Sequence, residues 1–218
     1  MRATALALAL LLLAACAYDE RPGEDTGRAH VQAALVTEGY AAPAPAEAHV
    51  VVRTYLRAYD IAGSSALELR AAMDRLGPKD PVDGTPYAGF TRWRIEWSYD
   101  HAGAMPCTLT RVRVVATIQI ALPRWRGGGS ADPGLAAEWA RFVAALRRHE
   151  NGHAEIAKRG ARRIARLLGS LPSFLSCARL ERAADSTATR TLEMMRRAEL
   201  AYDEWTRHGD THGVRFSA

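Results

Sequence analysis

The sequence predicts an α+β fold, with a small antiparallel sheet and one short helix followed by a long hairpin of two helices. Two observations carry this prediction. Residues 90–99 and 109–122 alternate between apolar and polar side chains, which is the period of a half-buried strand. Residues 134–168 instead repeat apolar side chains every three or four positions, which is the period of an amphipathic helix. Strands that precede helices, rather than alternating with them, are typical of the α+β class.

The N-terminal half contains the expected strands. Residues 50–61 are β-branched and aromatic, and they predict a first strand. Ser65 and Glu68 form a capping box that opens a helix over 66–76, which Gly77 and Pro78 end. The inward positions of the next two strands are Trp93, Ile95, Trp97 and Tyr99, then Val112, Val114, Ala116, Ile118, Ile120 and Leu122, with Pro123 as the expected end.

The C-terminal half contains the expected hairpin. Asp132 and Pro133 cap a helix over 134–168, and a second helix over 174–205 follows the break at Leu171-Pro172. The apolar stripe of the first helix consists of Leu135, Trp139, Phe142, Leu146, His149, His153, Ile156, Gly160, Ile164 and Leu167. Two histidines therefore lie on the face that is expected to meet the core.

The 218 residues suffice for one folded domain, which we place at residues 49–218. Residues 1–15 read as an export signal, because an apolar run from Ala3 to Ala15 is too short to span a membrane comfortably. Residues 16–48 are rich in Ala, Pro and Gly and predict a flexible tether. No internal repeat and no further transmembrane segment is evident.

The end of the apolar run, Leu13-Ala14-Ala15-Cys16, resembles a bacterial lipobox. This resemblance implies a lipidated Cys16 that anchors the protein in the bacterial cell envelope, facing the periplasm. A plain signal peptide cut nearby and a short buried helix are the alternatives. Cleavage before Cys16 leaves 29 − 1 = 28 basic residues against 24 acidic ones, a mildly basic chain. Nothing in the sequence indicates nucleic-acid binding.

Two cysteines remain in the exported part, Cys107 and Cys177. Because an exported protein meets an oxidising compartment, we expect a disulfide between them. Two buried free thiols are the alternative.

The stretch Arg147 to Ala157 holds a His-Glu-x-x-His motif. Two histidines four residues apart project from one helical face, which suits two ligands of a tetrahedral zinc ion. Glu150 follows His149 and lies about 100° around the helix, where it can serve as a general base. The alternative is a pair of core histidines bonded to carbonyl groups. Gly152 costs about 1 kcal/mol of helix propensity and indicates close approach of another backbone or of substrate.

Several stretches resemble a bacterial family of predicted secreted zinc-dependent proteases, catalogued largely as a domain of unknown function. They are "YDIAGSSALELRAAM", "GFTRWRIEW", "LPRW", "RRHENGHAEIA" and "YDEWTRHGDTHG", and they cover most of residues 59–213. The resemblance implies a zincin-like fold around the motif. It also favours His208 as the third zinc ligand beside His149 and His153.

Helix geometry leaves the third ligand open. In a straight hairpin that turns at Leu171, Glu193 is level with His149, whereas His208 overshoots by about 15 residues, or ~22 Å. His208 therefore requires a bend in the second helix, for which residues 184–191 are poor helix formers. Glu193 and Asp203 remain the alternatives.

Other polar residues near the C-terminus and on the helices have candidate roles. Tyr202 is a candidate oxyanion donor and Asp203 a candidate orienting group, with a capped helix end as the alternative. His212 is expected at the surface. The basic run is expected on a solvated face, with anionic lipid or envelope polymer as a second interpretation; it consists of Arg147, Arg148, Lys158, Arg159, Arg162, Arg163 and Arg166.

The sequence therefore predicts an envelope-tethered zinc metallopeptidase that cleaves a peptide or protein of the cell envelope, with Glu150 as base. We expect one sheet strand, residues 109–121, to pair with the substrate. A non-catalytic lipoprotein stapled by zinc through four ligands is the first alternative. A peptidoglycan amidase or peptidase with the same chemistry is the second.

Overall fold

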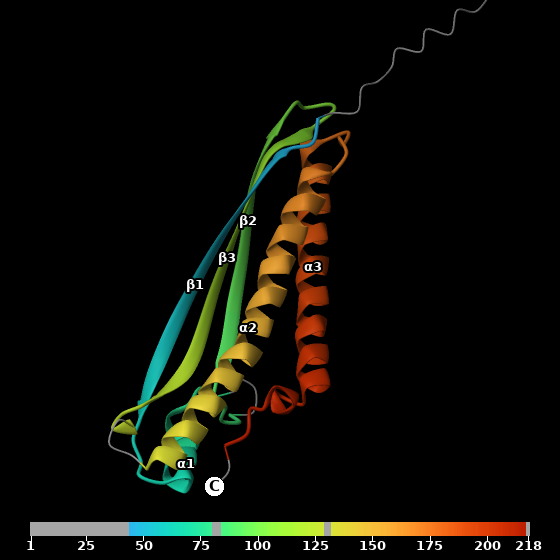
Figure 1. Cartoon of the computed structure of the whole chain (residues 1–218). Coiled ribbons are helices and arrows are strands. Elements are labelled where there is room, and N and C mark those ends of the chain that lie inside the picture. Colours follow the sequence, from blue (N-terminus) through green and yellow to red (C-terminus); the bar gives the residue numbers. More distant parts are fainter. Residues whose placement is uncertain (1–43, 80–83, 129–131, 217–218) are drawn as a thin grey trace, which may run out of the picture. The chain divides into compact units, whose positions relative to one another are not determined.

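The computed structural model describes residues 44–79, 84–128 and 132–216. The expected signal segment, the lipidated Cys16 and the tether up to residue 43 lie outside these residues. The elements follow in the order β1 (Glu47–Ile61), α1 (Ala66–Leu76), β2 (Phe90–Ala102), β3 (Thr108–Trp125), α2 (Pro133–Gly169), α3 (Cys177–Thr206) and the short 3₁₀ helix η2 (Asp210–His212). A three-stranded sheet, one short helix and two long helices confirm the α+β prediction (Figure 1).

The sheet is mixed, and the antiparallel expectation was wrong for one strand pair. Its order is β1-β3-β2. β2 runs antiparallel to β3, but β1 runs parallel to it, from the Glu47–Arg111 pair to the Ile61–Trp125 pair. The reason is topological: the chain reverses between β1 and β2 and again between β2 and β3, so the first and third strands share a direction.

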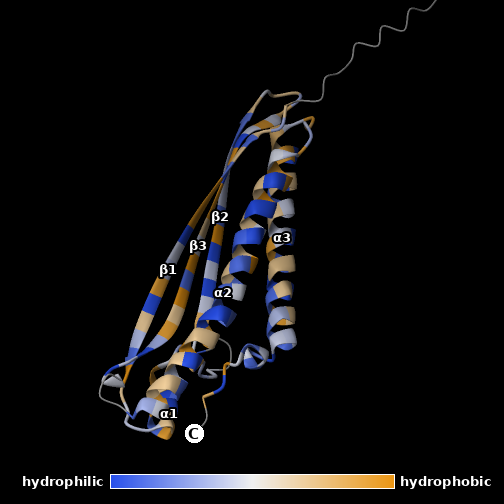
Figure 2. Cartoon of the chain, viewed as in Figure 1, coloured by the Kyte–Doolittle hydropathy of each residue, from blue (hydrophilic) through white to orange (hydrophobic). Residues whose placement is uncertain are grey.

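The alternation predicted for the strands is present. β3 buries Leu109 and, further along, Val112, Val114, Ala116, Ile118, Ile120 and Leu122, which face α2. β3 runs two residues past Pro123, to Trp125, because Pro123 pairs with Tyr59 at the sheet's end. Figure 2 shows hydrophobic and hydrophilic residues alternating along the strands. β3 is the central strand, and its two edges are paired with β1 and β2. The predicted pairing of β3 with a substrate is therefore wrong.

The helices begin where their caps predict. Ser65 accepts a hydrogen bond from the Glu68 amide at the start of α1, and Asp132 accepts one from the Leu135 amide at the start of α2. α2 lies along the sheet and α3 packs beside α2 (Figure 1). α3 continues without interruption through residues 184–191. Within the described residues, no helix is long and apolar enough to cross a membrane.

Cys107 and Cys177 form the expected disulfide, with an Sγ–Sγ distance of 2.11 Å. Next to it, Cys107 exchanges two backbone hydrogen bonds with Phe174, of 2.8 and 2.9 Å. The disulfide therefore fastens the start of α3 to the start of β3. At the same end, the Ala46 amide donates to the Gly169 carbonyl at the last residue of α2. This is the end at which the chain enters the fold.

Candidate metal centre

The two histidines of the motif lie on the buried face of α2. His149 is 5% exposed and His153 is 9% exposed. Their ring centroids lie 5.0 Å apart, and the rings are almost perpendicular. The helical stripe predicted from the sequence thus places both imidazoles against the neighbouring helix, α3.

Asp203 of α3 joins the two imidazoles. Its Oδ1 atom lies 3.3 Å from His149 Nε2 and 3.0 Å from His153 Nε2. One ligand atom of each of the three residues lies within 4.8 Å of the others. Two imidazole nitrogens and one carboxylate oxygen form a donor set that zinc accepts in proteins, so the residues present fit this metal.

The remaining ring nitrogens face side chains of α3. His149 Nδ1 lies 3.5 Å from Thr206 Oγ1, and His153 Nδ1 lies 3.6 Å from Glu199 Oε1, an oxygen that has no hydrogen-bond partner within the described residues. Thr206 Oγ1 in turn donates to the Tyr202 carbonyl. Because such contacts fix the rotation of an imidazole ring, they leave both Nε2 atoms aimed at the Asp203 carboxylate.

The carboxylates near His153 change its pKa. Burial lowers the pKa of His153, but the hydrogen bond to Asp203 and the nearby Glu199 carboxylate outweigh burial and raise the pKa to about 9. Burial raises the pKa of Asp203, but hydrogen bonds from His149 and His153 outweigh it and hold the pKa well below its ordinary value. The carboxylate is therefore charged, and a metal bound here would have to displace the proton of His153.

Glu150 faces β2 rather than α3. It is 4% exposed, and its Oε2 atom accepts a hydrogen bond of 2.7 Å from the Thr91 hydroxyl. A Cβ atom at Gly89 would lie 3.0 Å from Glu150 Oε1, so the backbone that leads into β2 closes over the carboxylate. Burial raises the pKa of Glu150, and the Thr91 hydrogen bond opposes this. A raised pKa makes a carboxylate a better base near neutral pH.

Tyr202 explains the glycine in the motif. Its ring stacks on His149 with centroids 5.2 Å apart, and its hydroxyl donates to the His149 carbonyl over 3.1 Å. A Cβ atom at Gly152 would overlap this phenol. The close approach inferred from Gly152 is therefore made by a side chain. The hydroxyl expected to act as an oxyanion donor has a partner within the protein.

His208 lies outside the group, and Asp203 takes the place expected for it. Arg207, His208 and Gly209 follow α3 in the left-handed conformation, and the His208 side chain is exposed. Glu193 is exposed as well. The straight-hairpin estimate failed because the helix ends are staggered: Asp203 lies 203 − 177 = 26 residues into α3, whereas His149 lies 169 − 149 = 20 residues before the end of α2. The difference of six residues corresponds to about 9 Å along the axis.

The left-handed turn brings His212 back to the site. The His212 ring centroid lies 5.9 Å from that of His149 and 6.0 Å from that of Tyr202. His212 Nδ1 is buried, and within the described residues it has no hydrogen-bond partner. Burial and the nearby charges of His149 and Arg148 lower the pKa of His212. His212 is partly exposed, so it lies at the surface as expected, but its ring also contacts the site. Nothing local in the sequence shows that the chain reverses here.

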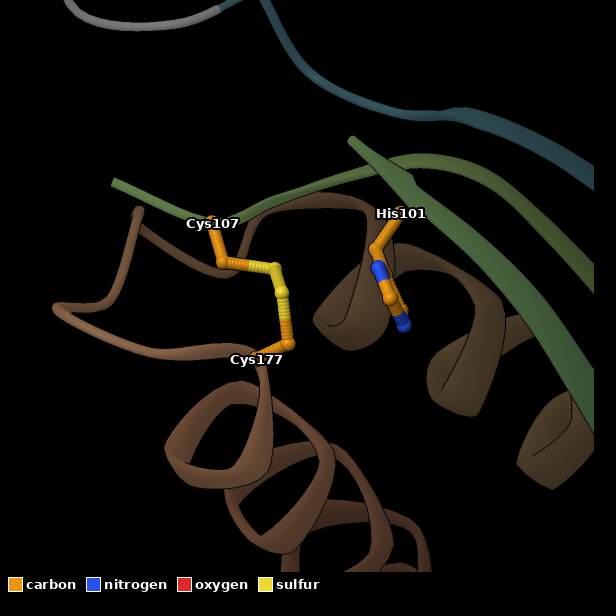
Figure 3. Close-up of side chains that lie close together, drawn as sticks. All are labelled: His101, Cys107 and Cys177. Carbon is orange, nitrogen blue, oxygen red and sulfur yellow. A yellow bond between two sulfur atoms is a disulfide. The ribbon is translucent and has the colours of Figure 1, made fainter. Parts of the chain in front are cut away.

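A second group of candidate ligand atoms comes from His101, Cys107 and Cys177. Figure 3 shows the two sulfur atoms bonded to each other, with His101 beside them. His101 itself pairs with Glu181 over 3.3 Å. Because a disulfide has no thiolate to offer a metal, this group does not compete with His149, His153 and Asp203.

Comparisons with known proteins identify a family for which no function is known. A family model described as a bacterial protein of unknown function (DUF922) matches residues 56–209, well over half of the chain. The matched range includes the motif and Asp203. No curated protein and no solved structure matches the chain.

Proposed function

Because the chain belongs to the bacterial family of unknown function DUF922, its activity has to be inferred from its own side chains, and we propose that it is a zinc-dependent metallopeptidase. The observation that carries the proposal is the meeting of His149 Nε2, His153 Nε2 and Asp203 Oδ1 beside a buried glutamate. Three protein ligands with space for a fourth are typical of catalytic zinc sites, whereas structural sites use four. The Asp203 side chain is 28% exposed, which supports a site that solvent reaches.

A zinc ion held by these three residues would supply Lewis acidity, polarising the scissile carbonyl and lowering the pKa of a water molecule. The chain's own residues do the rest. Glu150 accepts the proton of the attacking water and passes it to the leaving amine. Thr91 and the backbone at Gly89 hold its carboxylate in place. Tyr202 and Thr206 hold the His149 ring.

The substrate strand is reassigned from β3 to β2. β2 is an edge strand, and its Thr91 contacts both the carboxylate and the backbone carbonyl of Glu150. An extended peptide that paired with β2 would lie beside the base. This pairing would use backbone hydrogen bonds and therefore admit many peptide sequences.

The location is part of the same proposal. We propose that residues 1–15 are an export signal and that lipid at Cys16 anchors the mature chain in the bacterial envelope. The Cys107–Cys177 disulfide supports an oxidising compartment such as the periplasm.

Glu150→Gln tests the mechanism, with Glu155→Gln as the matched control on the same helix. Glu155 pairs with Lys158 and is 46% exposed. We expect the Glu150 variant to bind zinc with unchanged stoichiometry and to lose hydrolysis of a peptide library by a factor of about 10²–10⁴. The control should match the wild type. Equal turnover by Glu150→Gln and the wild type would remove Glu150 from the mechanism.

The same samples separate the alternatives. If zinc only staples the hairpin, chelation unfolds the protein and neither variant differs from the wild type in a peptide digest. Cross-linked peptidoglycan, offered beside the peptide library, distinguishes an envelope amidase from a general peptidase.

A further inference from the structure

The end of the fold at which the chain enters carries exposed apolar side chains. Met105, in the β2–β3 connection, is 78% exposed, and Leu175, in the α2–α3 connection, is 65% exposed. The two connections are joined by the Cys107–Phe174 hydrogen bonds and by the disulfide. Ala46 is bonded to Gly169 at this end, and Figure 1 shows the two connections and the start of β1 together. The described part of the chain therefore begins at this surface, at residue 44.

Arginines stand next to this surface along α2. Arg166 lies three residues before Gly169, and Arg162 and Arg163 lie about one further turn away. All three are exposed and line a groove of about 540 Å³ between α2 and α3, together with the apolar side chains of Met194 and Met195. None of the residues that form the metal centre lines this groove.

The charges at this end are unbalanced. The nearby acids Glu47, Asp100 and Glu181 pair with His49, Arg111 and His101, and Asp185 accepts hydrogen bonds from Trp97 and Tyr99. Within the described residues, no ion pair involves Arg162, Arg163 or Arg166. Each of these acids thus has a partner within the protein, while the three arginines keep their charge for an external partner.

We propose that this end is a docking surface for an anionic lipid bilayer, with Met105 and Leu175 entering the interface and Arg162, Arg163 and Arg166 contacting headgroup phosphates. The spacing fits: Arg162 to Arg166 lie about 5–10 Å from the helix end at 1.5 Å per residue, comparable to the depth of the headgroup region on one side of a bilayer. Apolar side chains at the tip with arginines behind them are the arrangement that interfacial binding requires.

Docking at this end would fix the distance between the membrane surface and the metal centre. His149 lies 20 residues before Gly169, so the centre would be held about 30 Å above the contact surface. The inference concerns lipid binding and does not depend on the proposed peptidase activity.

The test uses the full chain with Cys16→Ser, so that a cysteine placed at Leu175 is the single free thiol for an environment-sensitive fluorophore. Leu67→Cys is the matched control, because Leu67 is 67% exposed and lies in α1, at the opposite end of the sheet (Figure 1). The chain is reconstituted into vesicles of phosphatidylcholine, with or without phosphatidylglycerol. Both samples share the same N-terminal residues, so a difference between them reports docking rather than anchoring.

We expect the probe at position 175 to shift to the blue and to be quenched by spin-labelled lipid only when phosphatidylglycerol is present. The probe at position 67 should remain in water. Replacing the three arginines by glutamine should weaken docking by about 100-fold, or about 3 kcal/mol, at about 1 kcal/mol for each charge. Leu175→Glu, with the probe moved to Met105→Cys, should also abolish the shift.

Equal signals in the two kinds of vesicle, or an unchanged signal in the triple arginine variant, would overturn the proposal. A response of the 175 probe to a soluble acidic peptide that equals its response to vesicles would also overturn it, since this surface would then bind acidic proteins. Circular dichroism of each variant shows whether the fold is retained. The fluorescence readout does not depend on zinc binding or peptide hydrolysis. A failure of the peptidase proposal can therefore be distinguished from a failure of the docking proposal.

Discussion

Gly152→Ala is the substitution whose outcome most sharply separates local propensity from tertiary packing. A mid-helix glycine costs about 1 kcal/mol relative to alanine, so propensity alone predicts that the variant is more stable. In the structure, a Cβ atom at this position would overlap the hydroxyl oxygen of Tyr202 and lie 2.8 Å from its Cε1 atom. The phenol therefore has to move.

The expected magnitude combines three contributions. Overpacking at this position costs about 2 kcal/mol. Loss of the hydrogen bond from Tyr202 to the His149 carbonyl costs about 1 kcal/mol, and better propensity returns about 1 kcal/mol. Gly152→Ala should thus lower the free energy of unfolding by about 2 kcal/mol. In a Tyr202→Ala background, Gly152→Ala should instead raise the free energy of unfolding by about 1 kcal/mol. The coupling energy between the two positions is then about 3 kcal/mol.

Urea unfolding of the metal-free protein, followed by circular dichroism, measures these differences. Asn151→Ala is the control, because Asn151 is the exposed neighbour on the same helix and should gain about 0.5 kcal/mol in both backgrounds. If Gly152→Ala stabilises the protein with Tyr202 present, the phenol does not occupy the space beside the motif and the reasoning is refuted.

Three further predictions follow from the contacts of the site and the sheet. In a chelator competition, Asp203→Asn should weaken zinc binding, and Glu199→Gln should weaken it by about 10–100-fold. His208→Ala should leave zinc binding unchanged, and weaker binding by this variant would restore His208 as the ligand. Replacing Cys107 and Cys177 together by serine opens a loop with a sequence separation of 70 and should cost about 4 kcal/mol in urea unfolding, while a loss below about 1 kcal/mol would mean that other contacts already fix α3. Burial and the charge of Asp74 raise the pKa of Tyr59, whose hydroxyl donates a hydrogen bond to the Ala88 carbonyl. Because the pKa is higher in the folded than in the unfolded protein, the contribution of Tyr59 to stability is complete below pH ~10 and is lost as the pH rises above that value. Tyr59→Phe should therefore flatten the alkaline fall of the unfolding free energy, and an unchanged curve would show that another group causes it.

The sequence by itself determined the features that depend on near neighbours. The alternation of residues 90–99 and 109–122 determined which face of each strand is buried. The stripe of α2 placed His149 and His153 on one buried face. The caps at Ser65 and Asp132 marked the helix starts. These features follow from periods of two and 3.6 residues, which act over a few residues and are readable in the chain.

Only the tertiary structure decided how distant segments meet. It made Asp203 rather than His208 the partner of the imidazoles, because the stagger of α3 against α2 depends on the connection at residues 170–176 and on the disulfide. It set β1 parallel to β3, placed Tyr202 against Gly152 and returned His212 to His149. Each of these outcomes depends on an offset between elements of a few ångströms, and such offsets are fixed by packing and cross-links rather than by any local pattern of residues.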